Sequence, residues 1–183
     1  MKIKSKSILC VLLMISMLSA CSSTTSDFSG IAMGDKHFRK ANMGDSVAKV
    51  MASEKGDFVE EITADSEEGK KYFAEGAEGT VLIYEDSNVS GHKVKILYVF
   101  LEDELIGAVM AFDALYSKDL YKQLSEYFIS ELPESAEAPL SAAITFKEAQ
   151  YWEIDDVAFE VLLSGSNIVM VEVATKRYFN QLF

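Results

Sequence analysis

A long apolar segment in the middle of the chain alternates with a period of two. Within residues 94–101, every second side chain is large and apolar, namely Val94, Ile96, Tyr98 and Phe100. That period places these side chains together on one face of a β-strand. The acidic turn 102–104 then leads into a second apolar segment, 105–112. Because a short turn joins antiparallel neighbours, the chain is expected to fold around an antiparallel sheet.

Other segments carry the β-branched and aromatic side chains that favour strands. We predict further strands at 81–84, 144–146, 151–154, 157–163 and 168–174. Polar turns are predicted between them, at 85–91, 155–156 and 164–167. Residues 58–63 also fit a strand, whereas the acidic stretch 67–79 is interpreted as a loop.

Two segments have the 3.6-residue period of amphipathic helices. Residues 46–54 form the first, with Ser46 as its predicted N-cap. Residues 118–131 form the second, with Ser117 as its predicted cap. The buried face of the second helix is predicted to consist of Leu120, Leu124, Tyr127 and Phe128.

The order of these elements is helix, three strands, helix, three strands. It predicts an α+β fold, an antiparallel sheet with helices packed on one face. Tyr84 and Trp152 stand at corresponding places in the two halves, which favours a tandem α-β-β-β pseudo-repeat. A single unrepeated α+β sandwich explains the same pattern and stays open as the alternative.

The N-terminal residues have the composition of a secretion signal. Lys2, Lys4 and Lys6 precede an apolar run of ten residues, 8–17. A membrane-spanning helix needs about 20 apolar residues, so this run fits the apolar region of a signal peptide better. A buried N-terminal helix or an uncleaved membrane anchor is the alternative.

The residues that follow this run identify the kind of signal. Leu18, Ser19, Ala20 and Cys21 resemble the lipobox of bacterial lipoproteins at all four positions. The resemblance implies cleavage after Ala20, a diacylglyceryl thioether on Cys21 and, usually, acylation of the new amino terminus. Two or three acyl chains hold a protein stably on a membrane.

The same resemblance predicts the location of the protein, and the small polar residues 22–30 predict a tether between anchor and domain. The resemblance implies a protein of the cell envelope, anchored by lipid and facing the periplasm or the exterior. The residue after the anchor is Ser22, not Asp. This resembles the pattern of Gram-negative lipoproteins that are exported to the outer membrane. We expect a signal peptide at 1–20, a flexible tether at 21–30 and one α+β domain at 31–183.

The charge of the mature chain limits its partners. Of 17 basic residues, three lie in the signal, so the mature chain keeps 14 against 29 acidic residues, a net charge of −15. That balance argues against nucleic acid and against electrostatic docking on anionic lipid. Cys10 is removed with the signal, so Cys21 has no partner for an intrachain disulfide.

The chain offers little for catalysis. His37 and His92 are its only histidines, and neither lies near a nucleophile motif. Ser46 and Lys49 have the Ser-x-x-Lys spacing of penicillin-binding enzymes, but a helix cap explains Ser46 more simply. We therefore predict no catalytic residue and no enzymatic activity.

Metal and cofactor motifs are incomplete. Residues 86–91 copy the first half of a calcium loop, but its twelfth position is Leu97 instead of Glu, so a hairpin turn is the favoured interpretation. The acidic turns 102–104 and 155–156 fit solvated hairpin tips, with a cation site as the alternative. No glycine-rich phosphate loop follows a strand. We predict no metal ligand and no cofactor.

A second resemblance concerns the folded domain. The helix start Gly44-Asp45-Ser46-Val47-Ala48-Lys49-Val50 is similar to that of small envelope lipoproteins of the BamE/SmpA type. These proteins, and the related β-lactamase-inhibitor-protein fold, pack helices on one face of a small antiparallel sheet and bind other proteins. The Gly-x-Pro that follows this helix in those lipoproteins is missing here, since Gly56 precedes Asp57 and Phe58.

These observations lead to ranked hypotheses of function. The first is a non-enzymatic, lipid-anchored envelope protein that binds another protein through a sheet face or edge, as an envelope-assembly accessory module. The second is a module that binds a small ligand or a cell-wall fragment between helix and sheet. An enzyme is the third. The apolar C-terminal stretch 178–183 is expected to fold back onto the domain, with a partner-docking tail as the alternative.

Overall fold

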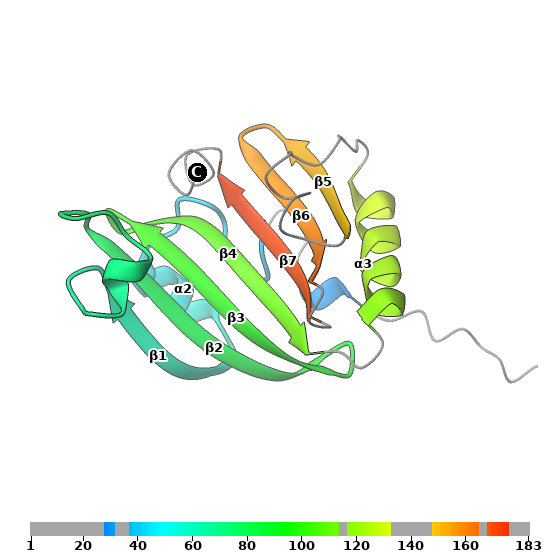
Figure 1. The fold of residues 1–183 in the computed structure, drawn as a ribbon, viewed down its shortest axis with the longest axis horizontal. Helices are drawn as coiled ribbons and strands as arrows, with labels where there is room; N and C mark the ends of the chain where they lie inside the picture. The colour runs from blue at the N-terminus through cyan, green and yellow to red at the C-terminus, as the bar shows by residue number, and fades with distance from the viewer. Residues whose placement is uncertain (1–27, 32–36, 114–116, 133–147, 165–167, 176–183) are drawn as a thin grey trace, which may run out of the picture.

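A single antiparallel sheet forms the centre of the protein. The computed structural model describes residues 28–31, 37–113, 117–132, 148–164 and 168–175 (Figure 1). The signal, Cys21, the tether up to residue 27, and the predicted strand 144–146 lie outside the described residues, as does the stretch 178–183. Seven strands pair in the order β1-β2-β3-β4-β7-β6-β5. The predicted α+β class with an antiparallel sheet is confirmed.

The strands fall into two successive groups. The first group comprises β1 (Asp57–Thr63), β2 (Gly79–Val89), β3 (His92–Leu101) and β4 (Glu104–Asp113). The second comprises β5 (Glu148–Ile154), β6 (Val157–Leu163) and β7 (Ile168–Thr175). After β4 the chain passes through helix α3 to the far edge at β5 and returns, so that β7 pairs with β4. This pairing joins both groups into one sheet.

The helical elements are short except for one. They are α2 (Val47–Ser53), α3 (Ser117–Glu131) and the 3-10 turns η1 (Ser29–Ile31) and η2 (Gly69–Lys71). Ser46 caps α2 as predicted, since its side chain accepts a hydrogen bond from the backbone N–H of Lys49. Ser117 differs from the prediction, because it is the first helical residue of α3 instead of its cap.

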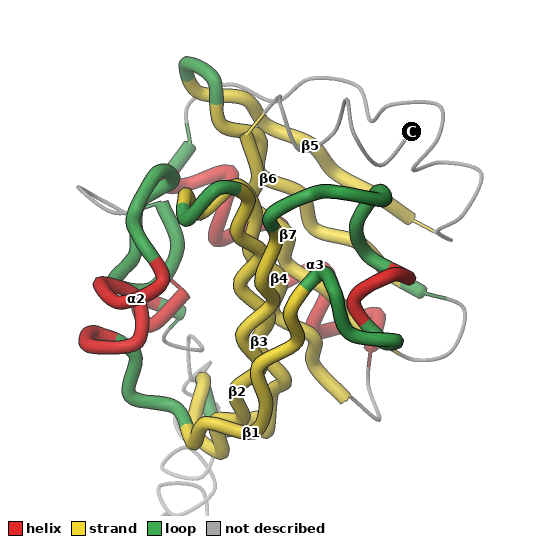
Figure 2. The backbone as a smooth tube through the Cα atoms, turned by 90° about the vertical axis from the view of Figure 1, so that its left-hand side faces the viewer, coloured by secondary structure: helices red, strands yellow, loops and turns green. Residues whose placement is uncertain are grey.

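One face of the sheet carries the main core. The alternation in β3 is confirmed: Val94, Ile96, Tyr98 and Phe100 are all buried. One row of partners crosses the sheet on this face, from Tyr98 in β3 to Trp152 in β5, through Ala108, Val173 and Phe159. Val50 of α2 and four α3 residues (Leu120, Tyr121, Leu124 and Phe128) belong to the same core. Both helices therefore pack on this one face, which we call the helix face; Figure 2 shows α2 on one side of the strands.

The packing of α3 is aromatic. The ring of Phe128 stacks on Trp152, with 5.5 Å between centroids, and also contacts Phe159. Tyr127, predicted on the buried face, is half-buried and contacts Phe28 at 5.8 Å. Phe28 and Ile31 are themselves buried, so the folded part of the chain includes Phe28.

The turns are tighter than the sequence predicts. Residues 85–91 are not one turn, because β2 continues to Val89 and only Ser90 and Gly91 reverse the chain, both with positive φ. Glu102 and Asp103 turn the next hairpin in the same way. Two-residue turns with positive φ match the twist of the strands, so Ser90 and Gly91 alone can reverse the chain. The polar residues 86–88 are therefore not needed for the turn and belong to β2. The predicted loop 67–79 contains η2 and ends where β2 begins at Gly79.

Candidate functional site

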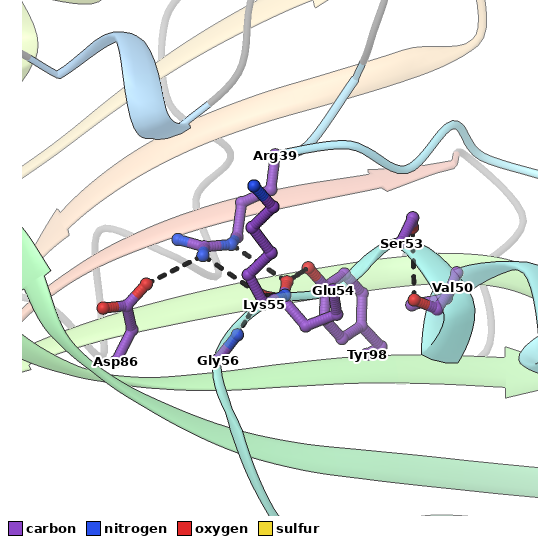
Figure 3. A network of polar contacts seen from close by, with 8 residues as sticks. All are labelled: Arg39, Val50, Ser53, Glu54, Lys55, Gly56, Asp86 and Tyr98. Carbon is purple, nitrogen blue, oxygen red and sulfur yellow. Dashed lines mark hydrogen bonds and ion pairs between the residues drawn. The ribbon is translucent and has the colours of Figure 1, made fainter.

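A network of polar contacts surrounds the carboxylate of Glu54, which follows α2 (Figure 3). Arg39 donates to it from Nε at 2.9 Å and from Nη2 at 3.1 Å. Tyr98 of β3 donates its hydroxyl to the same carboxylate. The backbone N–H groups of Lys55 and Gly56 add bonds of 2.6 and 2.7 Å. Nη2 of Arg39 also reaches Asp86 of β2 at 2.8 Å.

Burial and hydrogen bonding oppose each other at this carboxylate. The side chain of Glu54 is only 2% exposed, and its burial alone would raise its pKa. The bonds from Tyr98, the Gly56 backbone and Arg39 outweigh burial and leave the pKa of Glu54 below its ordinary value. Burial together with the neighbouring carboxylate raises the pKa of the Tyr98 phenol. The charged form of Glu54 is thus the stable one in the folded protein.

This network is a structural clasp. It joins the segment around Arg39, the end of α2 and strands β2 and β3. Glu54 receives five donors, which leaves it no free position from which to take a proton from a substrate. It stabilises the fold by holding the segment around Arg39 and the end of α2 against the sheet.

The residues singled out in the sequence are engaged in similar structural contacts. His37 accepts a hydrogen bond at Nδ1 from the backbone N–H of Met43, at 3.0 Å. His92 lies edge-on to Phe112 at the start of β3. Asp103, in the acidic turn 102–104, accepts a bond from the N–H of Val47 in the first turn of α2, at 3.0 Å. Among the described residues, no three His, Cys, Asp or Glu side chains gather in a way that could hold a metal ion.

A pair of carboxyl groups lies on the sheet face opposite the helices. Glu160 of β6 and Glu172 of β7 are direct register partners, and Tyr151 of β5 is the partner of Glu160 on the other side. Glu160 is only 4% exposed. Burial raises the pKa of Glu160 to about 7, and burial together with Glu160 does the same for Glu172. Sequence reasoning missed this pair, although a Glu inside each of two apolar strands was a visible signal.

The edge strand β1 is the most open strand of the sheet. It pairs with β2 on one side only, and six of its seven residues are exposed, Ile62 being the exception. Phe58 and Val59 are large apolar side chains with about half of their surface exposed. Asp57, Glu60 and Glu61 add three carboxylates that make no ion pair with any described residue. At the other edge, three residues in the middle of β5 are half-buried and Trp152 is fully buried.

A bulge at Val59 arranges the side chains of β1. The register skips this residue, since Phe58 pairs with Tyr84 and Glu60 with Ile83. Asp57 and Glu60 therefore lie on the face opposite the helices, whereas Phe58 and Glu61 lie on the helix face. The ring of Phe58 contacts Tyr84 edge-on at 5.5 Å. The strand thus presents backbone groups, an apolar side chain and acidic side chains together.

Comparisons with known proteins give no further guidance. No family model, curated protein or solved structure matches this chain. The resemblance to bacterial lipoproteins and to BamE/SmpA-type proteins therefore stays a prediction from the residues quoted above. None of the helices within the described ranges is long and apolar enough to cross a membrane.

Proposed function

We propose that this chain is a lipid-anchored protein of the cell envelope whose domain binds another protein through the edge strand β1, without catalysing a reaction. The observation that carries the binding role is the open edge of β1, with its exposed Phe58 and Val59. An extended segment that adds to such an edge gains main-chain hydrogen bonds, while adjacent side chains supply selectivity. The lipobox ending at Cys21 supports the anchor.

The distance from Cys21 to the domain supports a partner close to the membrane. The first described residue is Phe28, which is buried and contacts Tyr127. The seven residue steps from Cys21 to Phe28 span at most about 25 Å when fully extended. The anchored domain would therefore stay near the membrane surface, where a membrane protein or another anchored protein is within reach of β1.

The alternative of a ligand pocket between helix and sheet has less support. Leu124 and Phe128 of α3 are completely buried, and Phe128 stacks directly on Trp152. Side chains therefore fill the space between α3 and the sheet. A small ligand would have to displace this aromatic packing.

We further propose that the sheet arose from a tandem unit, α2 with β2–β4 and α3 with β5–β7. In the strand order β2-β3-β4-β7-β6-β5, the strands of each proposed unit run in sequence from the outside to the central pair β4 and β7. Tyr84 lies in β2 and Trp152 in β5, the first strand of each proposed unit, and both residues belong to the same core. An experimental structure in which the two units do not superpose would contradict this proposal.

Photo-crosslinking in living cells tests the binding role. A photoreactive phenylalanine analogue would replace Val59 in the full, processed chain. We expect a discrete adduct of higher mass that contains a second protein. The matched control places the same residue at Ile129, which is 54% exposed on α3, a helix that packs on β6 and β7, away from β1 in the sheet. Absence of a protein adduct from Val59, or equal adducts from both positions, would contradict binding through β1.

A further inference from the structure

The three acidic side chains of β1 restrict which segment can pair with it. They occupy both faces, with Asp57 and Glu60 on the face opposite the helices and Glu61 on the helix face. All three are exposed and have no cationic partner among the described residues. An incoming strand places its side chains about 5 Å from those of β1, where like charges repel and opposite charges attract.

The same charges work against pairing between two copies of this chain. If β1 paired with β1 of another copy, six carboxylates would meet along one edge. The two copies would also repel each other as whole molecules, because the full chain has a net charge of −12. Acidic residues on an edge strand are a known protection against such association. The same carboxylates do not oppose pairing with a basic strand. They therefore disfavour association between copies of the chain and favour a basic partner.

Phe58 adds an apolar requirement. It lies on the helix face, on the same side of β1 as Glu61, and about half of its surface is exposed. Its ring packs edge-on against Tyr84 of β2. A partner strand would cover it best with an apolar side chain at the directly opposite position. The other face of β1 carries Asp57 and Glu60 near this end, where basic side chains fit.

From these positions we propose that β1 receives an extended, basic segment of a partner protein, with lysine or arginine side chains on both faces and an apolar side chain opposite Phe58. This proposal rests on the proposed function, since it names the partner segment for the same edge. Electrostatic attraction would also steer the basic segment toward this acidic domain.

The test combines the Val59 photo-crosslinker with charge reversal in the full, processed chain. In the variant Glu60→Lys/Glu61→Lys we expect the adduct yield to fall by about tenfold or more, because two attractive pairs become repulsive. The control Glu126→Lys/Glu131→Lys makes the same change in net charge on exposed positions of α3 and should retain the adduct. Peptide mapping of the adduct should place the crosslink in a segment with at least two lysine or arginine residues.

The outcomes separate the two proposals. A protein adduct that survives charge reversal of β1, or that maps to a segment without basic residues, would overturn the basic-segment proposal and leave protein binding intact. An adduct with a second copy of this chain, or with lipid, would also overturn it. No adduct from Val59 would overturn the proposed function itself. Circular dichroism of each variant establishes that a lost adduct does not reflect unfolding.

Discussion

Two acidic residues, Glu54 and Glu160, are both buried but lie in opposite environments. Glu54 has five hydrogen-bond donors, including Arg39 and Tyr98. Glu160 has another carboxyl group, that of Glu172, as its register partner. The pKa of Glu54 is therefore lowered, whereas burial raises that of Glu160 to about 7. The two residues should affect stability with opposite dependence on pH.

Glu54→Gln should destabilise the domain strongly. The substitution removes the charge that compensates the Arg39 guanidinium, whose side chain is only 12% exposed. Breaking one partner of a buried ion pair typically costs 3–5 kcal/mol, and we expect about 3 kcal/mol because Asp86 remains. Urea unfolding at pH 7 measures this loss. Because the folded pKa of Glu54 is lowered, its contribution is present at neutral pH and lost as the pH falls through that pKa.

The control for this prediction is a surface ion pair. Lys122 and Glu126 lie 3.7 Å apart on α3, and both are largely exposed. Glu126→Gln should change the free energy of unfolding by less than about 1 kcal/mol. Equal losses from Glu54→Gln and Glu126→Gln would contradict the role given to the clasp.

Glu160→Gln should stabilise the protein at alkaline pH. A carboxyl group whose folded pKa is raised is neutral in the folded state at low pH, and its ionisation costs stability as the pH rises from about 4.5 through 7. The shift from 4.5 to about 7 corresponds to roughly 3 kcal/mol. We expect thermal unfolding to show this gain at pH 8 and almost none at pH 4, whereas Glu131→Gln on the surface of α3 should show neither. Parallel pH profiles for Glu160→Gln and wild type would contradict this account.

Among the elements, helix α3 packs one of its faces on the second group of strands. Phe128 is fully buried against Trp152 and Phe159, whereas its neighbour Ile129 is 54% exposed. Phe128→Ala should cost about 3–5 kcal/mol, since it removes a large buried ring and leaves a cavity. Ile129→Ala should stay within about 0.5 kcal/mol. Chemical unfolding of both variants measures the difference, and similar losses would show that α3 does not pack as described.

Elements with a clear apolar period were predictable from the sequence. The alternation of Val94, Ile96, Tyr98 and Phe100 placed β3 and its buried face correctly, because burial of one face dictates the pattern. The continuation of β2 to Val89 was missed, since residues 86–88 are of types that favour turns, whereas Asp86 and Val89 pair with Val94 and His92 of β3 across an irregularity in the register. Strand β1 was ambiguous because six of its seven residues are exposed. Its sequence therefore lacks the alternation of apolar and polar side chains that identifies a half-buried strand.

The polar contacts were beyond local sequence reasoning. Arg39 and Glu54 are 15 residues apart, and Glu54 and Tyr98 are 44 apart, so only the folded sheet brings them together. Adjacency of Glu160 and Glu172 likewise depends on the register between β6 and β7. The open edge became visible only once the strand order placed β1 at the end of the sheet.

For the whole molecule, membrane attachment and partner binding are assigned to different parts. The proposed anchor is one residue, Cys21, and the acidic domain has no surplus of basic side chains with which to hold an anionic surface. The seven residue steps from Cys21 to Phe28 would keep Phe28 within about 25 Å of the lipid, and the domain therefore near the membrane surface. Loss of the anchor should therefore release the entire protein.

Palmitate labelling of Cys21→Ala tests the anchored character of the protein most directly. Cells producing the full chain would be grown with radioactive palmitate and then separated into membrane and soluble fractions. We predict that Cys21→Ala abolishes labelling and removes the protein from the membrane fraction, whereas Cys10→Ala, which alters the only other cysteine, retains both. Undiminished labelling of Cys21→Ala would contradict the account.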